Sequence, residues 1–495
     1  MPPVRRARGR GAVPEEAPAD AGPRAGLMAP ARRALVVGLL AIVTCGAFEA
    51  MAVTTAMPVV AAELGGQGAY GLAFSLFLTA SMAATAAAGP WCDLRGARPA
   101  LLTGLGLMCA GLVLGGAASD FAVFTLGRMV SGLGAGFMIV AVYVVIGQVL
   151  PSALQPVMFG WFSAAWVVPS LVGPYVSGLL AQHVSWRWPF LGVVPIVVAA
   201  MALVWPRVRS LGPPAPDESS GSGSPTDGRR RALLGLVLAA GIAGAQWAAV
   251  AAADPTSPVR AAAPALLAVV GVVGAALAAG AARRLILRGT WTARRGLPAV
   301  MAVRGLITFA FFGAEAFIPL LLVDRYGLEP SIAGLALTGG ALGWTAGSFA
   351  QARAWLPRSA YLVLGPAAVA ACLAAVAASV AAAAPAWAIP AAWVLAGAGM
   401  GLAMSTTSVA MLDLSDAAER GRNSASLQLA DMLGGVIGTA GAGSLYALLL
   451  DASRTPGALG FALLTGVLAV PALVGAFAGT RTHAPSSADR KAPRA

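Results

Sequence analysis

Lysine is almost absent from this sequence, although the chain is strongly basic. Lys491 is the only lysine among 33 lysine and arginine residues, and the formal net charge is +13. A nucleotide-binding P-loop of the form G-x-x-x-x-G-K-[ST] requires a lysine directly after its second glycine. No such loop can form here, which excludes ATP hydrolysis at a P-loop as an energy source within this chain.

Charged residues of either sign are also scarce. They make up 11% of the chain, whereas a soluble globular protein carries about 25%. Hydrophobic residues make up 58%, the mean hydropathy is +0.79, and long apolar runs recur along the whole length. Each run is long enough to cross the ~30 Å hydrocarbon core of a bilayer as a helix. The sequence therefore predicts an all-α polytopic membrane protein, and not a barrel of short alternating strands.

Cysteine and histidine are too few and too scattered to suggest a metal or redox site. The four cysteines lie in or beside apolar segments without ligand spacing, and we interpret them as small packing residues: Cys45, Cys92, Cys109 and Cys372. His183 and His483 lie at a helix end and in the C-terminal tail, and we assign them no role. Nothing in the sequence indicates an enzyme, a cofactor or a bound metal. A transport activity would then have to draw on an ion gradient.

Fourteen apolar segments, separated by charged or Pro/Gly-rich stretches, are predicted to be membrane-spanning helices. Their approximate spans are 35–60, 70–90, 99–118, 121–147, 156–181, 186–206, 232–253, 260–281, 297–322, 331–352, 360–383, 386–411, 424–449 and 458–479. The seventh and eighth are the weakest of the set, because they are rich in Ala, Gly and Val and are separated only by "DPTSP".

The arginines fix the expected orientation. If the N-terminus is cytoplasmic, 27 of the 33 cations fall in inner segments and four in outer loops, while Arg128 and Arg304 lie within helices. Cytoplasmic loops of membrane proteins carry such an excess of Lys and Arg. We therefore expect a protein of the cytoplasmic membrane with both termini inside and no signal peptide. The basic charge then faces the anionic leaflet of the lipid bilayer and not a nucleic acid.

Two pairs of similar segments recur at nearly one offset, which suggests an internal repeat. "FEAMAVTTAMP" and "AEAFIPLLLVD" place Glu49 and Glu315 266 residues apart, and "GPYVSGLL" and "GTAGAGSLY" place Gly173 and Gly438 265 apart. Chance similarity between Ala/Gly-rich helices is the alternative. A repeat predicts two six-helix bundles around a central cavity, with two extra helices between them. The expected division is a disordered tail 1–33, an N-terminal bundle 34–206, a linker 207–231, the extra pair and a basic loop 232–296, a C-terminal bundle 297–480 and a tail 481–495.

A short loop between the second and third helices carries a recognisable pattern. In "GPWCDLRGAR" one acid and two guanidiniums can latch helix ends together, and the glycines permit a tight turn. The loop resembles the G-x-L-a-D-r-x-G-r signature of the major facilitator superfamily through Gly89, Asp93, Arg95, Gly96 and Arg98. Ordinary inside-positive loop chemistry is the alternative.

Further segments resemble the fourteen-helix drug:proton antiporters of that superfamily. "RMVSGLGAG" resembles the helix-4 pattern, with Arg128 present and Ser131 where glutamine is usual. "VPSLVGPYVSG" resembles the helix-5 antiporter motif through Gly173, Pro174 and Gly178, and Gly160 upstream of it matches the same motif. Pro169 and Ser177 stand where glycines are usual. "SWRWPFLGVVPI" resembles the entry to helix 6, and "FEAMAVTTAMP" the helix-1 signature, with Glu49 where aspartate is usual. The resemblance implies proton antiport.

Three acids lie within apolar segments: Glu49, Glu315 and Asp431. An ionised side chain at mid-bilayer costs at least about 2.5–3.5 kcal/mol, so it faces a polar cavity, pairs or binds protons. At 1.5 Å per residue, Glu49 and Arg128 both lie about 10 Å below the outer surface and could meet. Arg304 and Asp431 lie about 10 Å from the inner face and form a second possible pair.

We hypothesise that Glu49 is the main protonation and cation-recognition site and that Arg128 biases its protonation. Glu315 would be the symmetric partner of Glu49 across the cavity, and Asp431 a secondary proton or substrate site. Each could instead be a static polar group that fixes helix packing. Aromatic residues on the helices expected near the cavity could stack on a cationic compound, or only pack or face lipid: Trp161, Phe162, Trp166, Phe309, Phe311, Phe312 and Phe317.

The sequence thus favours a monomeric, proton-coupled exporter of amphipathic, often cationic small molecules. One alternative within the same fold is an exporter or importer of a single metabolite. A non-transporting receptor or a passive pore is the alternative from another class.

Overall fold

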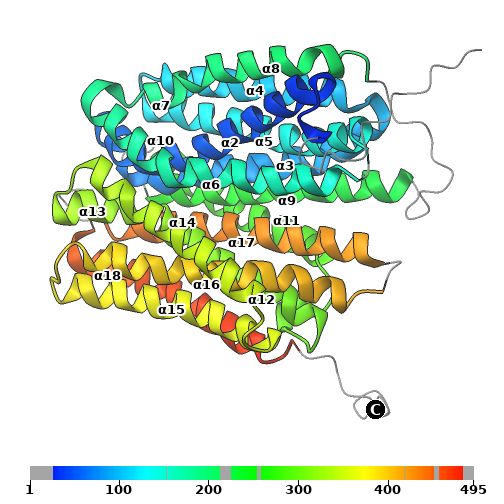
Figure 1. Ribbon diagram of the computed structural model, residues 1–495. Helices are drawn as coiled ribbons and strands as arrows, with labels where there is room; N and C mark the ends of the chain where they lie inside the picture. Colours follow the sequence, from blue (N-terminus) through cyan, green and yellow to red (C-terminus); the bar gives the residue numbers. More distant parts are fainter. Residues whose placement is uncertain are drawn as a thin grey trace, which may run out of the picture.

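The structure is a computed structural model that describes residues 26–151, 153–211, 225–253, 258–416, 419–450 and 456–482. Most of the two predicted tails, and the middle of the predicted linker 207–231, lie outside the described residues. The described residues form helices and no β-strand (Figure 1).

A helix is present at each predicted position. The longer helices are α2 (Pro30–Glu63), α3 (Tyr70–Arg95), α4 (Ala97–Gly116), α5 (Phe121–Val149), α6 (Gln155–Leu180), α8 (Val193–Val208), α9 (Pro225–Ala253), α11 (Pro264–Leu285), α12 (Leu297–Glu315), α14 (Pro330–Ala352), α15 (Arg358–Ala381), α16 (Ala388–Asp413), α17 (Arg420–Leu448) and α18 (Gly457–Gly479). The shorter elements are η1 (Gln67–Ala69), η2 (Ala181–Ser185), α7 (Trp188–Leu191), α10 (Pro258–Ala262), η3 (Thr290–Thr292) and α13 (Ile318–Tyr326).

Two predicted helices are interrupted in the structure. The sixth divides into α7 and α8 at Gly192, and the ninth divides into α12 and α13 at Ala316 and Phe317. Pro319 stands at the start of α13, where its missing N–H and fixed φ suit a new helix start. The second break follows Glu315 directly, so this acid lies at a helix end and not in a continuous helix.

Twelve helices in the described residues are long and apolar enough to cross a membrane, two fewer than predicted. The difference is α14 and α17, which have 23 and 29 residues but are not among the twelve. Both carry several glycines and hydroxyl side chains, which lower their hydropathy. Both also pack inside the bundle, α14 against α6 and α16, and α17 against α3 and α12.

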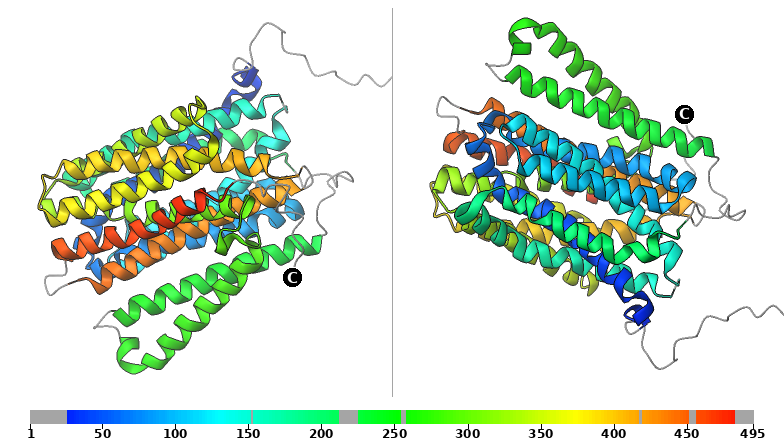
Figure 2. Two further views of the ribbon diagram at one scale, coloured as in Figure 1. Left: turned by 90° about the horizontal axis from the view of Figure 1, so that it is seen from below. Right: turned by 90° about the horizontal axis from the view of Figure 1, so that it is seen from above.

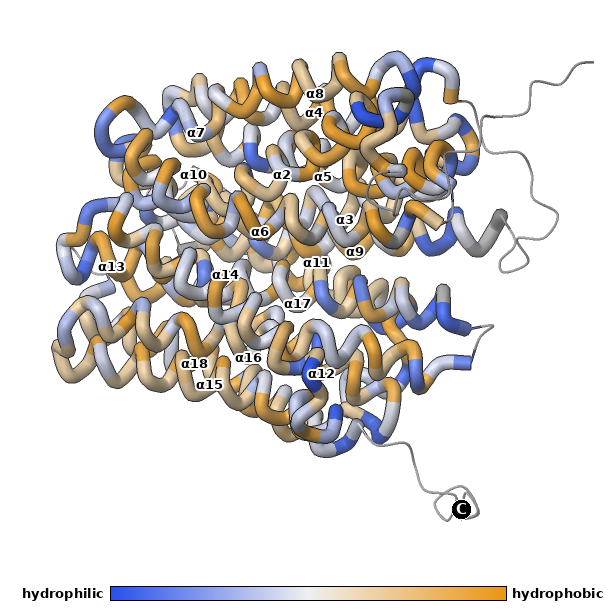
Figure 3. Tube along the Cα trace, viewed as in Figure 1, coloured by the Kyte–Doolittle hydropathy of each residue, from blue (hydrophilic) through white to orange (hydrophobic). Residues whose placement is uncertain are grey.

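The helices run roughly parallel in two groups, with α2 to α8 in one and α12 to α18 in the other (Figure 1). The start of α2 and the end of α18 lie at one end of the molecule, here named the terminal end; the other is the distal end. Figure 3 shows hydrophilic residues concentrated at the two ends and hydrophobic residues along the helices between them. This is the pattern expected of helices that cross a hydrocarbon layer.

Glycines let particular helices approach closely. On α5, Gly127 and Gly134 face α4, where a Cβ would overlap the backbone of Gly115 and Met108. Gly132 on the same helix faces α3, where a Cβ would overlap the carbonyl of Phe77. Small residues at such crossings are typical of membrane helices, because association there depends on close van der Waals packing. These contacts hold α5 against α3 and α4 and fix the position of Arg128.

The predicted extra pair, α9 and α11, forms a hairpin on the outside of the bundle (Figure 2). Gly241 of α9 and Gly274 of α11 meet so closely that a Cβ on either would lie 2.6 Å from the other's carbonyl oxygen. The hairpin lies along α3, where Gly235 meets Ala86, and along α17. It therefore flanks both groups of helices at their junction.

Candidate functional site

A buried ion pair joins α2 to α5. Arg128 Nη1 donates to Glu49 Oε1, and the exposed fractions are 3% for Arg128 and 1% for Glu49. Ser131 Oγ, one turn along α5, donates to the same Glu49 oxygen at 3.2 Å. The pairing expected from depth along the two helices is confirmed. Ser131 stands where the family pattern has glutamine, and that motif position was the only signal for its role.

The arginine of this pair also lies over an aromatic ring. Arg128 Cζ lies 4.2 Å from the centroid of the Phe77 ring on α3, a cation–π distance. The close approach of α3 to α5 at Gly132 brings the ring there. Three helices thus contribute to one desolvated charge site.

The pair is not fully satisfied. Glu49 Oε2 and Arg128 Nε are buried and have no hydrogen-bond partner among the described residues. A buried polar atom without a partner costs about 1–3 kcal/mol, and more for a charged group. Binding of a proton, or of a hydrogen-bond donor of a ligand, at the free carboxylate oxygen would therefore lower the free energy of this site.

A second ion pair lies in the other group of helices, nearer the terminal end. Arg304 Nε on α12 donates to Asp431 Oδ1 on α17 at 2.9 Å. Arg304 Nη1 donates to the Met404 carbonyl and the Thr407 hydroxyl on α16, both at 2.9 Å. The close approach of Gly434 to Gly305 brings α17 against α12 at this level. This pairing was also expected from depth and is confirmed.

Replacing Arg304 with lysine should lower the free energy of unfolding by about 1.5–3 kcal/mol, because an ammonium cannot reach α16 and α17 together as the planar guanidinium does. Thermal unfolding of the purified protein in detergent would measure the loss. Arg358→Lys is the matched control, since its pair with Asp413 is half exposed and such pairs contribute about 0–1 kcal/mol. Equal losses in the two variants would contradict this account of Arg304.

Glu315 is placed differently from Glu49. It is half-buried at the end of α12 and makes no hydrogen bond or ion pair with another described residue. No interaction joins it to Glu49 among the described residues. The expected exposure of Glu49 to a shared watery chamber is not seen in this conformation, because packing around the ion pair closes it off.

The two groups of helices meet in the distal half. Tyr70 Oη on α3 donates to the Ala316 carbonyl at 3.0 Å, next to Glu315. Gly71 and Gly443 pack backbone to backbone between α3 and α17, and Gly178 packs on Ser331 between α6 and α14. Sequence reasoning missed this closure, because no motif in the sequence marks Tyr70, Gly71 or Ser331.

Two more hydrogen bonds cross the same junction. Thr338 Oγ1 on α14 donates to the Leu171 carbonyl on α6 at 3.0 Å, and Ser331 Oγ contacts Gln182 Oε1 at 3.0 Å. All these groups lie in the distal halves of their helices. The distal end is therefore closed in this conformation.

The loop between α3 and α4 forms the expected tight turn. Gly96 has φ = 87°, which favours glycine, and Arg98 Nη1 donates to the Arg209 carbonyl beyond α8 at 3.0 Å. A Cβ at Gly89 would meet nothing within 4 Å. Asp93 and Arg95 are exposed and form no ion pair with another described residue. The turn at Gly96 is as predicted, but the predicted loop is shorter in the structure: α3 runs on to Arg95, so Gly89, Asp93 and Arg95 lie in the helix, and the acid does not latch any helix here.

The predicted helix-5 motif has mixed placements on α6. Gly178 lies at the junction described above, and Pro174 offers its carbonyl to the close approach of Gly334 on α14. Gly173 lies against Phe48 of α2, whereas Gly160 has open space around it. Ser177, where glycine is usual, donates to the Ala52 carbonyl of α2 at 2.6 Å and so ties α6 to α2.

The predicted cavity aromatics divide into two kinds. Phe311 stacks on Trp393 at 4.9 Å, Phe317 packs between Tyr70 and Tyr446, and Phe162 is buried. These three are packing residues here. Trp161, Phe309 and Phe312 are half-buried and Trp166 is 45% exposed, so these four remain accessible.

Comparison with known proteins shows which family and relatives the chain resembles. The family model described as Major Facilitator Superfamily matches residues 39–439. The chain is 26% identical over 445 residues to the "Probable multidrug-efflux transporter Rv1634" of Mycobacterium tuberculosis, with 88% of this chain and 91% of that protein covered. It is 28% identical over 179 residues to the "Acurin A biosynthesis cluster MFS-type transporter" of Aspergillus aculeatus, covering 36% of this chain but only 32% of that protein. The chain thus matches about a third of the length of the latter relative.

Solved structures show the same fold. A bacterial homolog of the human lysosomal transporter Spinster, in an inward-facing and unoccupied conformation, gives a TM-score of 0.63 at 16% identity, covering 92% of this chain and 98% of that one. At this identity the likeness establishes the fold alone. The family match spans most of the sequence, and the chain therefore belongs to the major facilitator superfamily.

Proposed function

We propose that this membrane transporter is a proton-coupled exporter of amphipathic, often cationic small molecules, and that it works by alternating access. The unsatisfied ion pair of Glu49 and Arg128 carries the proposal. Two elementary charges are buried between helices, and one carboxylate oxygen has no hydrogen-bond partner among the residues that the structure describes. The similarity to Rv1634, named as a probable multidrug-efflux transporter, supports the substrate class.

Protonation of Glu49 would couple to a change of conformation for an electrostatic reason. A proton on the carboxylate removes the negative charge that Arg128 faces. An uncompensated buried charge costs about 3–5 kcal/mol, so the guanidinium must find water, another acid or a new contact. A cationic substrate could in turn replace Arg128 at the carboxylate. Proton and substrate would then exclude each other at one site, which is the requirement for antiport.

The proposed topology has fourteen spans, with α14 and α17 as the two polar members. Many glycine positions of these helices face neighbouring helices, in their own group and across the junction, so low hydropathy is compatible with a span. Both termini would be cytoplasmic, in a monomer of the cytoplasmic membrane with the domain boundaries expected above. The terminal end is then the cytoplasmic one, and the end that is closed in this conformation faces outward.

Glu49→Gln tests the proposal. The amide keeps the shape but cannot exchange a proton, so proton release driven by substrate in inverted vesicles should fall at least about tenfold, equal to 1.4 kcal/mol. Substrates would be screened across cations, neutral compounds and anions. Glu63→Gln is the matched control, because Glu63 is an exposed residue at the end of the same helix. Unchanged coupling in Glu49→Gln would refute the role of Glu49.

Export of one compound made by the same cell is a second candidate. The match to a transporter named for a biosynthesis cluster favours it, although that match covers only part of both chains. The substrate screen in inverted vesicles distinguishes broad efflux from dedicated export. Response to many unrelated compounds supports broad efflux, and response to one supports dedicated export.

A further inference from the structure

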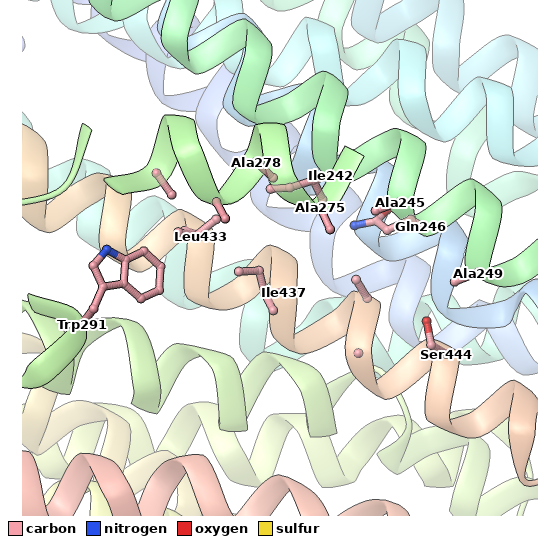
Figure 4. Close-up of a pocket in the computed structure, with 14 residues that line it drawn as sticks. Ile242, Ala245, Gln246, Ala249, Ala275, Ala278, Trp291, Leu433, Ile437 and Ser444 are labelled. Carbon is pink, nitrogen blue, oxygen red and sulfur yellow. The ribbon is translucent and has the colours of Figure 1, made fainter. Parts of the chain in front are cut away.

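An apolar groove lies outside the ion-pair sites, between the α9–α11 hairpin and α17 (Figure 4). Its volume is about 410 Å³, and every lining residue is uncharged. Trp291 stands at one end beside Leu433, and Ser444 stands at the other. Leu433 and Ser444 are eleven residues apart on α17, so the groove is about 16 Å long. Drug-sized ligands occupy sites of about 300–1,000 Å³.

One polar side chain in this groove has no hydrogen-bond partner within the described part of the chain. Gln246 of α9 is 6% exposed, and neither its Nε2 nor its Oε1 has a hydrogen-bond partner among the described residues. Figure 4 shows its amide directed into the groove, opposite the side of α17 that carries Ser444. Burying an unpaired amide costs about 1–3 kcal/mol on scales from protein mutations. A ligand that pairs with it would recover that cost.

The position of Gln246 specifies the ligand chemistry. It lies seven residues before the end of α9, about 10 Å into the span. A phospholipid keeps its polar atoms at the membrane surface, and its methylene chain offers neither donor nor acceptor. The occupant must instead place one group with both a donor and an acceptor inside the hydrocarbon layer. A charge there would have no counter-charge in the groove, so the occupant is neutral.

We infer that this groove binds a neutral, elongated amphipathic small molecule that enters from the membrane, with an amide or carboxylic acid group at Gln246 and an apolar body along α17. Ile437, Gly441 and Ala279 are exposed on its open side, which gives access from lipid. The groove is distinct from the proton site, because its lining residues come from α9, α11, η3 and α17, whereas Glu49 and Arg128 lie on α2 and α5. Binding here does not depend on proton coupling.

The test uses the purified full-length protein in lipid nanodiscs and ω-bromododecanamide as the probe. Bromine quenches tryptophan, and Trp291 lines the end of the groove remote from Ser444. We expect saturable quenching that Trp291→Phe largely removes. Gln246→Leu should raise the Kd about tenfold, because it removes both hydrogen bonds to the probe amide. ω-Bromododecane, which lacks the amide, should bind equally weakly to both forms.

Two further variants separate blockage from misfolding. Ala279→Phe fills the groove and should abolish saturable quenching, whereas Val273→Phe, at an exposed position on the other side of the same helix, should not. Gln246→Leu should also leave thermal stability unchanged or raised, since no protein partner is lost. A loss of stability in Gln246→Leu, or an unchanged Kd, would overturn the inference. The inference would also be overturned if phosphatidylglycerol alone displaced the probe, or if cross-linking showed that a second copy of the chain covers Trp291. Because no proton gradient is applied, these outcomes are independent of the Glu49→Gln experiment.

Discussion

Replacing Arg128 with methionine should lower the free energy of unfolding by about 3–5 kcal/mol, since it leaves a buried carboxylate without its counter-charge. In this variant Glu49 would keep only the hydrogen bond from Ser131 at 3.2 Å, and the contact with the Phe77 ring would also be lost. Methionine has a comparable length and an apolar character, so a cavity would not be the main cause. Thermal or denaturant unfolding in detergent would measure the loss.

The double variant Arg128→Met with Glu49→Gln is the control for this prediction. It carries neither charge, so it should be more stable than Arg128→Met alone. The difference from additivity gives the coupling energy of the pair, which should be about 0.5–3 kcal/mol. Strictly additive losses would mean that the pair contributes packing and no electrostatic interaction, and would also weaken the proposed proton site.

The sequence was informative about the charged residues inside helices because few arrangements are open to them. Depth along a helix follows from 1.5 Å per residue, and an arginine within the hydrocarbon layer needs an acid at its own depth. Arg128 and Arg304 each had an acid at a matching depth, and both of the pairs expected on this ground formed. Helix positions were equally predictable, since breaks in apolar runs leave little freedom in a bilayer.

Contacts that depend on conformation could not be predicted. Asp93 lies in the last turn of α3 and has no ion pair among the described residues, so the latch expected from its motif is not formed in this conformation. The contact of Tyr70 with Ala316 depends on which end of the bundle is closed. The sequence predicts α14 and α17 as spans like the others, although their glycine and hydroxyl positions lower their hydropathy and pack against neighbouring helices.

Replacing Gly71 with valine should open the distal end. Its Cβ would overlap the backbone of Gly443, and neither helix backbone can move away without separating α3 from α17. Overpacking of this kind costs about 1–3 kcal/mol. The cost applies only where the two glycines meet, so it disfavours the distally closed conformation and not the open one. A bias of this size shifts the equilibrium about 5- to 150-fold.

Spin labels on the two sides of the distal end would report this shift. Ser119 and Trp387 are exposed in distal loops of the two groups of helices, and cysteines at both sites in a background without native cysteines would carry the labels. Gly71→Val should lengthen the label distance in most molecules. Gly106→Val is the matched control, because a Cβ at Gly106 meets nothing within 4 Å. If Gly71→Val instead unfolds the protein, the smaller Gly71→Ala should give an intermediate shift. An unchanged distance in a folded variant would mean that the Gly71–Gly443 contact does not hold the distal end closed.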